Sequence, residues 1–337
     1  MYGKRKKDNY WLLLVTLGIL LILAFVFSTC IGVAGSGINI VFEAVTKFNT
    51  DSAIHQVIRE MRIPRVVGAI FIGAGLSVSG AILQAIGNNP FADAGLLGIN
   101  AGAGFMVALA TALFSSISPH WVMVLAFIGA AVSVSITYSI GASSKKGVIP
   151  VRLLLAGIAV TAFLTALTQG IALVFGLSKN LSFWQAGTLS GVSWMQIFVT
   201  APWMLLAGVC TMFLLSSLSI LSLGEERAVG LGIRVKLVQM VGIIISLIFA
   251  GCSVMIAGGI SFLGLIIPHV ARFLVGPDYR KIIPVAALGG ALLMVLADLC
   301  ARMINAPYDT PVGALVSIIG VPFFLGMTYH KRRGSNG

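Results

Sequence analysis

Apolar residues fill this chain in long uninterrupted runs that are separated by short polar stretches. A run of about 20 apolar residues can cross a bilayer as a helix, whereas a transmembrane barrel shows short segments of alternating polarity. The run at 259–275 is short and contains Pro268, so a nine-span or re-entrant arrangement stays open. The pattern predicts an all-α, polytopic transmembrane helical bundle of about ten spans, at roughly 11–29, 63–86, 94–114, 120–142, 151–175, 194–221, 236–256, 259–275, 283–304 and 311–329.

An even number of spans places both termini on one side of the membrane, and the basic residues indicate which side. Cytoplasmic connections carry an excess of Lys and Arg. With both basic ends inside, sixteen of the 22 Lys and Arg residues fall on the cytoplasmic side. We therefore predict a single transmembrane domain, 1–337, with cytoplasmic tails at 1–10 and 330–337 and a cytoplasmic connection at 222–235.

The composition agrees with a membrane environment. Hydrophobic residues make up 58% of the chain and charged residues only 9%, whereas soluble domains carry about 25% charged residues. The net charge of +12 follows the predicted membrane sides rather than one basic stripe, so we expect no nucleic-acid partner. The cysteines and histidines lack metal-ligand spacing, and the chain has no ATP-binding glycine loop. We predict no metal, no cofactor and no catalytic residue.

Charged residues at the predicted outer ends of two spans call for a specific explanation. Arg62 and Arg65 bracket Pro64, and their spacing of three places both guanidinium groups on one helix face. Basic residues are uncommon on the outside, which indicates a purpose other than anchoring at lipid headgroups. Asp298 lies within the ninth predicted span, four residues before Arg302, so these two side chains can pair along one face.

A polar stripe follows the fifth predicted span. Thr161, Thr165 and Gln169 recur every four residues, which aligns them on one helix face. Such a stripe suits either hydrogen bonding between helices or a pathway that water can enter. The residues alone leave both interpretations open.

Several long segments together form a distinctive pattern. The first is RIPRVVGAIFIGAGLSVSGAILQAIGNNPFADAGLLGINAGAG at 62–104. It is followed by RLLLAGIAV at 152–160, LGEERAVGLG at 223–232, GGISFLGLIIPHVAR at 258–272, and then ADLCAR and DTPVGALVSIIGVPFF. In order and spacing these segments resemble the FecCD-type permease family, the membrane subunits of ABC importers for iron-siderophores and vitamin B12. The resemblance is specific for the family and says little about the substrate.

The resemblance implies two docking sites. In the family, the positions of Arg62, Arg65 and Arg302 receive carboxylates from the two lobes of a substrate-binding protein, for which the guanidinium fork is well suited. A coupling loop inserts into a cleft of the ATPase subunit, and there small residues permit close approach. The residues of this chain that match the coupling loop are Gly224, Glu225, Glu226, Arg227, Ala228 and Gly232.

The resemblance also bears on the transport route. In the family, the fifth helices of two subunits flank the translocation channel, which favours a pathway role for Thr161, Thr165 and Gln169. The position of the cytoplasmic gate matches Ile149, Pro150 and Val151, which are more apolar than the family pattern.

The sequence thus predicts the permease subunit of an ATP-driven importer in the bacterial cytoplasmic membrane, with a ferric siderophore, first of all a hydroxamate, as substrate. Its expected partners are the lipid bilayer, a second permease subunit (identical or a paralogue), two cytosolic ATPase subunits that hydrolyse the ATP, and an external substrate-binding protein. Permeases for haem or corrinoids are the alternative. A proton-coupled secondary carrier is a further one, suggested by Asp298 and by the similarity of 74–78 to 250–254, which is typical of inverted repeats.

Overall fold

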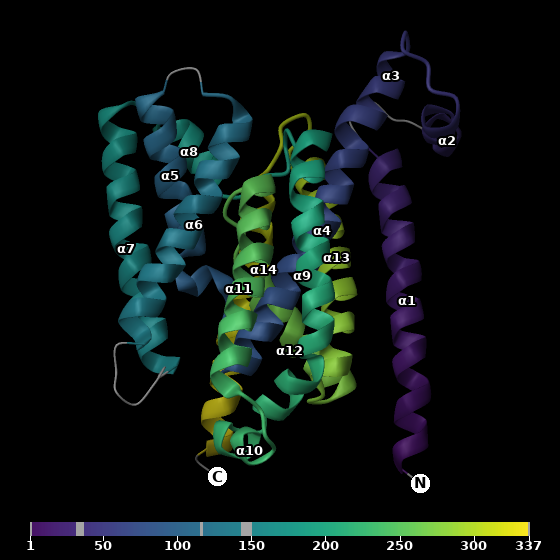
Figure 1. The fold of residues 1–337 in the computed structure, drawn as a ribbon. Coiled ribbons are helices and arrows are strands. Elements are labelled where there is room, and N and C mark those ends of the chain that lie inside the picture. Colours follow the sequence, from purple (N-terminus) through teal and green to yellow (C-terminus); the bar gives the residue numbers. More distant parts are fainter. Residues whose placement is uncertain (1, 32–36, 115–116, 143–149, 336–337) are drawn as a thin grey trace.

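The computed structural model describes residues 2–31, 37–114, 117–142 and 150–335. Within these ranges all regular structure is helical, which confirms the predicted all-α fold. Figure 1 shows the long helices side by side, with α1 (Tyr2–Cys30) beginning and α14 (Val312–Ser335) ending at the same end of the bundle. Both described ends of the chain therefore lie at the same end of the bundle.

Each of the ten predicted spans corresponds to one helix of the described chain. Seven of these helices are long and apolar enough to cross a membrane: α1, α4 (Ile63–Ile86), α6 (Pro119–Ala142), α7 (Pro150–Val174), α9 (Trp194–Leu221), α11 (Val235–Ala257) and α13 (Tyr279–Ile304). Three apolar helices are shorter: α5 (Ile99–Leu113), α12 (Leu263–Val275) and the apolar part of α14. A helix of 13 residues reaches only about 20 Å, against a hydrocarbon core of about 30 Å. The number of full spans remains a prediction.

Two of the short helices begin where the backbone leaves the helical region. The predicted span at 94–114 is divided into the 3₁₀ turn η2 (Ala94–Leu97) and α5, because Gly98 between them has a φ of +81°. Residue Phe262, which precedes α12, likewise has a φ of +69°. A positive φ ends helical hydrogen bonding, so neither apolar run forms one continuous helix.

Asp93 holds the starts of these two short elements together. Its side chain is buried, and its carboxylate lies beside the backbone of Ala94, Gly95 and Phe262. The first N–H groups of a helix have no partner within the helix and carry partial positive charge, so a carboxylate at this position suits the starts of both η2 and α12.

The long helix α4 is the centre of the packing, and small residues allow close contacts along it. A Cβ atom added to Gly80 would lie 1.9 Å from the carbonyl oxygen of Gly264 in α12. At the adjacent position, the Ser79 hydroxyl donates to the carbonyl of Ser246 in α11 at 3.2 Å, and the Ser246 hydroxyl donates to the carbonyl of Ser79 at 3.4 Å. Small residues that let backbones approach are typical of helix packing in membranes.

Four short helices occupy connections in which the sequence analysis predicted no element. Three of them, α2 (Ile38–Thr46), α3 (Ala53–Gln56) and the π-helical η1 (Val57–Arg62), lead from α1 into α4. The fourth, α8 (Ser178–Gln185), follows α7. In Figure 1, α2 and α3 lie at the end of the bundle opposite α10 (Glu225–Gly230).

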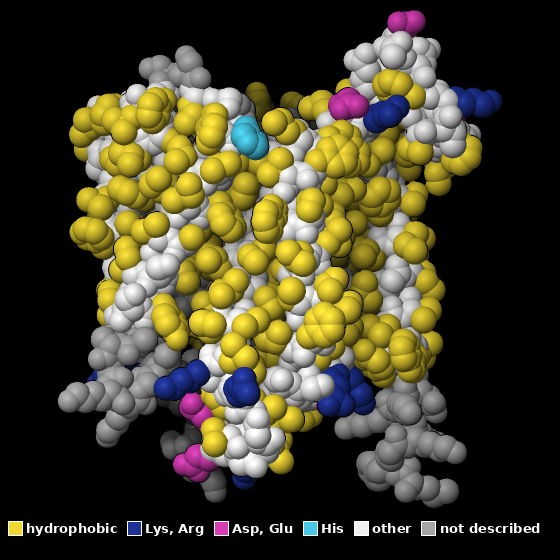
Figure 2. Space-filling view, viewed as in Figure 1, with side chains coloured by type: hydrophobic (Ala, Val, Ile, Leu, Met, Phe, Trp, Pro, Cys, Tyr) yellow, Lys and Arg dark blue, Asp and Glu magenta, His cyan; other side chains and the backbone are white. Residues whose placement is uncertain are grey.

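Apolar and charged side chains occupy different parts of the surface along the bundle axis. Figure 2 shows hydrophobic side chains over the middle of the visible face, whereas the coloured Lys, Arg, Asp and Glu side chains lie toward the two ends. This arrangement is that of a protein whose middle contacts lipid and whose ends contact water.

Candidate functional site

Five charged side chains meet at the end of the bundle that carries η1. We call them the arginine cluster: Arg62, Arg65, Arg302, Asp298 and Asp309. The predicted pair is present, since Arg302 Nε lies 3.2 Å from Asp298 Oδ2. Arg65 joins it, with its Nε 2.8 Å from Asp298 Oδ1 and its Nη1 3.1 and 3.2 Å from the two oxygens of Asp309. The three arginines predicted from distant parts of the sequence thus come together, with two carboxylates among them.

Two of these arginines also hold the end of α1. Arg62 Nη1 donates to the carbonyl of Thr29 at 3.1 Å. Arg302 donates from Nη1 to Ile31 O at 3.2 Å and from Nη2 to Ser28 O at 3.0 Å, and it also contacts the Ser28 hydroxyl. The last carbonyls of a helix have no partner within it and carry partial negative charge, so guanidinium groups stabilise this end.

The arginine cluster lines a cavity of about 560 Å³ between η1, α13 and the connection from α13 to α14. The arginines are largely enclosed: Arg62 is 7% exposed, and the side chains of Arg65 and Arg302 are 12% and 11% exposed. Asp298 is completely buried, whereas the side chain of Asp309 is 36% exposed. With three cations and two anions the cluster keeps one net positive charge, which suits an anionic group at the cavity.

Asp309 lies outside the membrane-spanning helices and is strongly influenced by its neighbours. Partial burial alone would raise the pKa of its carboxyl group, but hydrogen bonds from Arg65 and Ser190 together with the charges of Arg65 and Arg302 hold this pKa below its ordinary value. Asp309 is therefore ionised at neutral pH.

The predicted coupling loop lies at the opposite end of the bundle (Figure 1). Gly224 has a φ of +114°, and the helix α10 follows it directly. Ala228 is fully buried against Leu221 and Val235 of the same chain, so its side chain supports the loop instead of facing outward. Of the predicted loop residues, Glu225, Glu226, Arg227 and Gly232 are exposed, and three apolar neighbours that were not predicted as contacts are exposed as well: Leu223, Val229 and Leu231.

The predicted pathway residues of α7 do not share one environment. Thr161 lies close to Gly98 beside η2, and its hydroxyl has no hydrogen-bond partner among the described residues. Thr165 is half-buried, and Gln169 is exposed in a cavity of about 310 Å³ that is shared with Ser182 and Gln185 of α8. The stripe therefore starts inside the subunit and ends at a polar surface.

The predicted gate falls at the edge of what the structure describes. Ile149 lies outside the described residues, and Pro150 is the first residue of α7. The backbone of Val151 is helical, while its side chain lies outside the described part.

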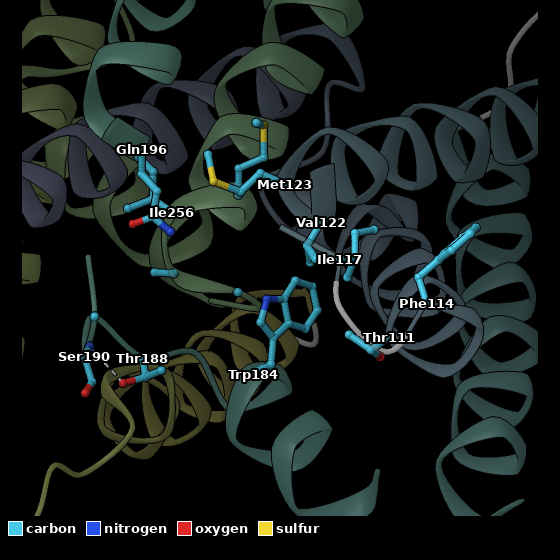
Figure 3. Close-up of a pocket in the computed structure, with 14 residues that line it drawn as sticks. Thr111, Phe114, Ile117, Val122, Met123, Trp184, Thr188, Ser190, Gln196 and Ile256 are labelled. Atoms are coloured by element: carbon cyan, nitrogen blue, oxygen red, sulfur yellow. Dashed lines mark hydrogen bonds between the residues drawn. The ribbon is translucent and has the colours of Figure 1, made fainter. Parts of the chain in front are cut away.

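A second cavity, at the end of the bundle that carries η1, was not predicted from the sequence. It has a volume of about 430 Å³, and Figure 3 shows the indole of Trp184 and the side chains of Thr188 and Gln196 at its wall. These residues come from α8, from the connection after it and from α9. Mixed aromatic and polar walls suit a contact with a large polar molecule.

A helical bundle with an apolar middle and charged ends is a multi-pass membrane protein, and known proteins define its class further. The model of the FecCD transport family matches residues 20–330. The chain is 43% identical over 319 residues to the iron(3+)-hydroxamate import system permease protein FhuB of Bacillus subtilis (strain 168), covering 94% of this chain and 82% of that one. It is 37% identical over 317 residues to the ferric enterobactin transport system permease protein FepD of Escherichia coli (strain K12), covering 94% of each.

Comparison with solved structures indicates the same class of protein. A solved inward-facing structure, assigned to a metal-chelate type ABC transporter, matches with a TM-score of 0.81 at 27% identity, covering 94% of this chain and 98% of that one. The chain belongs to the FecCD transport family.

Proposed function

We propose that this chain is the permease subunit of an ABC importer that carries a ferric siderophore, first of all a hydroxamate, across the bacterial cytoplasmic membrane. The observation that supports this most strongly is the 43% identity to a hydroxamate import permease over 94% of the chain. Separate ATPase subunits hydrolyse the ATP, and a second permease subunit, identical or a paralogue, completes the pathway.

The two ends of the bundle have different roles in this proposal. The arginine cluster at the outer end receives carboxylates of a substrate-binding protein, which its net positive charge favours. The loop 222–235 at the inner end contacts an ATPase subunit through the exposed face of α10. Closing and opening of the ATPase subunits then moves the helices between the two ends, and the substrate passes beside α7, with Ile149, Pro150 and Val151 as the inner gate.

A proton-coupled carrier is less consistent with the geometry. Asp298, the residue that suggested it, is completely buried and is shared by Arg65 and Arg302. A proton relay needs a carboxylate that can exchange protons with water. Here the carboxylate serves to hold two cations in place.

Uptake by proteoliposomes tests the proposal. Vesicles that contain the permease and its cognate ATPase, with the binding protein outside, are expected to accumulate ferric hydroxamate when ATP is enclosed, and vanadate is expected to stop this. Hemin and cobalamin as competitors distinguish the alternative substrates. Equal uptake without the ATPase, or uptake abolished by a protonophore at constant ATP, would contradict the proposal.

A first prediction concerns the exposed face of α10. We expect Val229→Asp to weaken association with the ATPase subunit about tenfold, because burying a side chain of this size stabilises a complex by roughly 1.5 kcal/mol. Ala228→Leu is expected to lower the thermal stability of the permease instead, because the larger side chain must enter a filled site. Co-purification with the ATPase and thermal unfolding measure the two effects. A Val229→Asp protein with unchanged ATPase association would show that the contact lies elsewhere.

A second prediction concerns the polar end of α7. Gln169→Leu removes an exposed amide from the cavity beside α8, so we expect slower uptake with unchanged association of both partner proteins. Leu173→Met, at an exposed apolar position of the same cavity, is the matched control and is expected to keep uptake normal. Equal uptake by both variants would remove Gln169 from the pathway.

A further inference from the structure

The two carboxylates of the arginine cluster differ in their environment, and this difference bears on how a partner binds. Asp298 is completely buried and lies between two arginines. Asp309 is partly exposed, and among the described residues its salt bridge is with Arg65. Asp298 is therefore a permanent structural counter-ion, whereas Asp309 occupies the outward-facing side of Arg65.

We propose that Asp309 competes with the docking carboxylate of the substrate-binding protein for Arg65. Asp309 pairs with Arg65 in the free permease and is displaced when the partner binds. The inference rests on the proposed docking role of the arginine cluster. It adds a residue that controls the affinity and exchange of the partner.

The geometry of the Arg65–Asp309 pair supports this role. Both oxygens of Asp309 lie within 3.2 Å of Arg65 Nη1, where an incoming carboxylate would bind. Arg65 Nη2 has no hydrogen-bond partner among the described residues, but it is buried and cannot be reached before Asp309 moves. A partner carboxylate must therefore replace Asp309 at Nη1, and it can then accept a hydrogen bond from Nη2 as well.

The surroundings of Asp309 allow its carboxylate to move away from Arg65. It lies in the connection between α13 and α14, which is not helical, and the side chain of Ser190 lies close to its carboxylate. After release from Arg65, the carboxylate can accept a hydrogen bond from the Ser190 hydroxyl. Ser190 lines the cavity that also contains Trp184, so displacement of Asp309 acts on the wall of the neighbouring cavity.

The net charge of the arginine cluster indicates whether neutralising Asp309 strengthens or weakens binding of the partner. The cluster has a net charge of +1 with Asp309 ionised, and neutralising this residue raises the net charge to +2. A partner then meets a stronger positive potential and no internal competitor. A partly exposed ion pair contributes up to about 1 kcal/mol, which corresponds to an affinity change of up to about fivefold.

The experiment measures binding of the cognate substrate-binding protein to the permease complex in nanodiscs. Asp309→Asn is expected to tighten binding up to about fivefold, mostly by slower dissociation. Glu60→Gln is the matched control, because Glu60 is exposed on η1 and its removal changes the charge of the same face equally. If Glu60→Gln tightens binding as much as Asp309→Asn, the effect is general electrostatics and the proposal is wrong. Weaker binding of Asp309→Asn would also overturn it, since Asp309 would then orient Arg65 for the partner.

A double-mutant cycle separates this inference from the docking proposal. In an Arg65→Gln background, Asp309→Asn is expected to have no effect on binding, because the guanidinium group with which Asp309 pairs is absent. The charge-balanced variant Arg65→Gln/Asp298→Asn tests docking itself. If that variant binds the partner normally, the docking site is misplaced. If it fails to bind while Asp309→Asn leaves affinity unchanged, docking stands and only the masking role is lost. Thermal unfolding of each variant confirms that it is folded.

Discussion

Replacing Asp298 with alanine is expected to destabilise the end of the bundle that carries the arginine cluster by about 3–5 kcal/mol, because it leaves Arg65 and Arg302 as buried cations without their shared partner. Arg302 also holds the end of α1, so we expect this helix to loosen as well. Thermal unfolding and limited proteolysis near Ile31 measure both effects.

The charge-balanced variant Arg65→Gln/Asp298→Asn is the control for this prediction. It removes one cation and one anion and leaves the net charge of the arginine cluster unchanged. We expect part of the lost stability to return, because only Arg302 is then left without its carboxylate and the new amide side chains can exchange hydrogen bonds. An Asp298→Ala protein as stable as the unmodified chain would show that the ion pairs contribute little.

Replacing Gly80 with alanine is expected to prevent close packing of α4 on α12. The new Cβ atom would lie 1.9 Å from the carbonyl oxygen of Gly264, and a backbone atom cannot move aside as a flexible side chain can. Overpacking in a filled core costs typically 1–3 kcal/mol, and a backbone clash lies at the upper end or beyond. We expect the variant to be made in low amounts and to unfold at a lower temperature.

Gly208 provides the matched comparison. It lies in α9, and a Cβ atom added there meets nothing within 4 Å. Gly208→Ala is expected to leave stability unchanged or to raise it by up to about 1 kcal/mol through the better helix propensity of alanine. If the two substitutions had the same effect, close approach of α4 and α12 would not be what requires a glycine.

Much of the fold was predictable because apolar length is a strong local signal. The span predicted at 194–221 matches α9 residue for residue, and each of the other nine predicted spans overlaps one α-helix. The predicted spans differ from the observed helices where a single backbone angle ends a helix or where a helix is short. The positive φ at Gly98 divides the predicted span at 94–114, and apolar content does not reveal it. The short helix α2 was missed because its nine residues are too few to give a spanning signal.

The candidate site was predictable only in part, because its contacts join distant parts of the chain. The spacing of four residues predicted the pair of Asp298 and Arg302. The pairs of Arg65 with Asp298 and Asp309 cross more than 230 residues, and only the packing of α13 on α4 creates them. Likewise, the small size of Ala228 predicted a close contact, but its burial shows that this contact is with its own chain.

The central claim is that the arginine cluster and α10 face opposite sides of the membrane and there bind different partners. Accessibility of introduced cysteines tests this most directly. A membrane-impermeant maleimide is expected to label Tyr308→Cys in intact cells and Val229→Cys only after the membrane is opened, with the unmodified chain as the control for its four native cysteines. Labelling of Val229→Cys in intact cells would contradict the account.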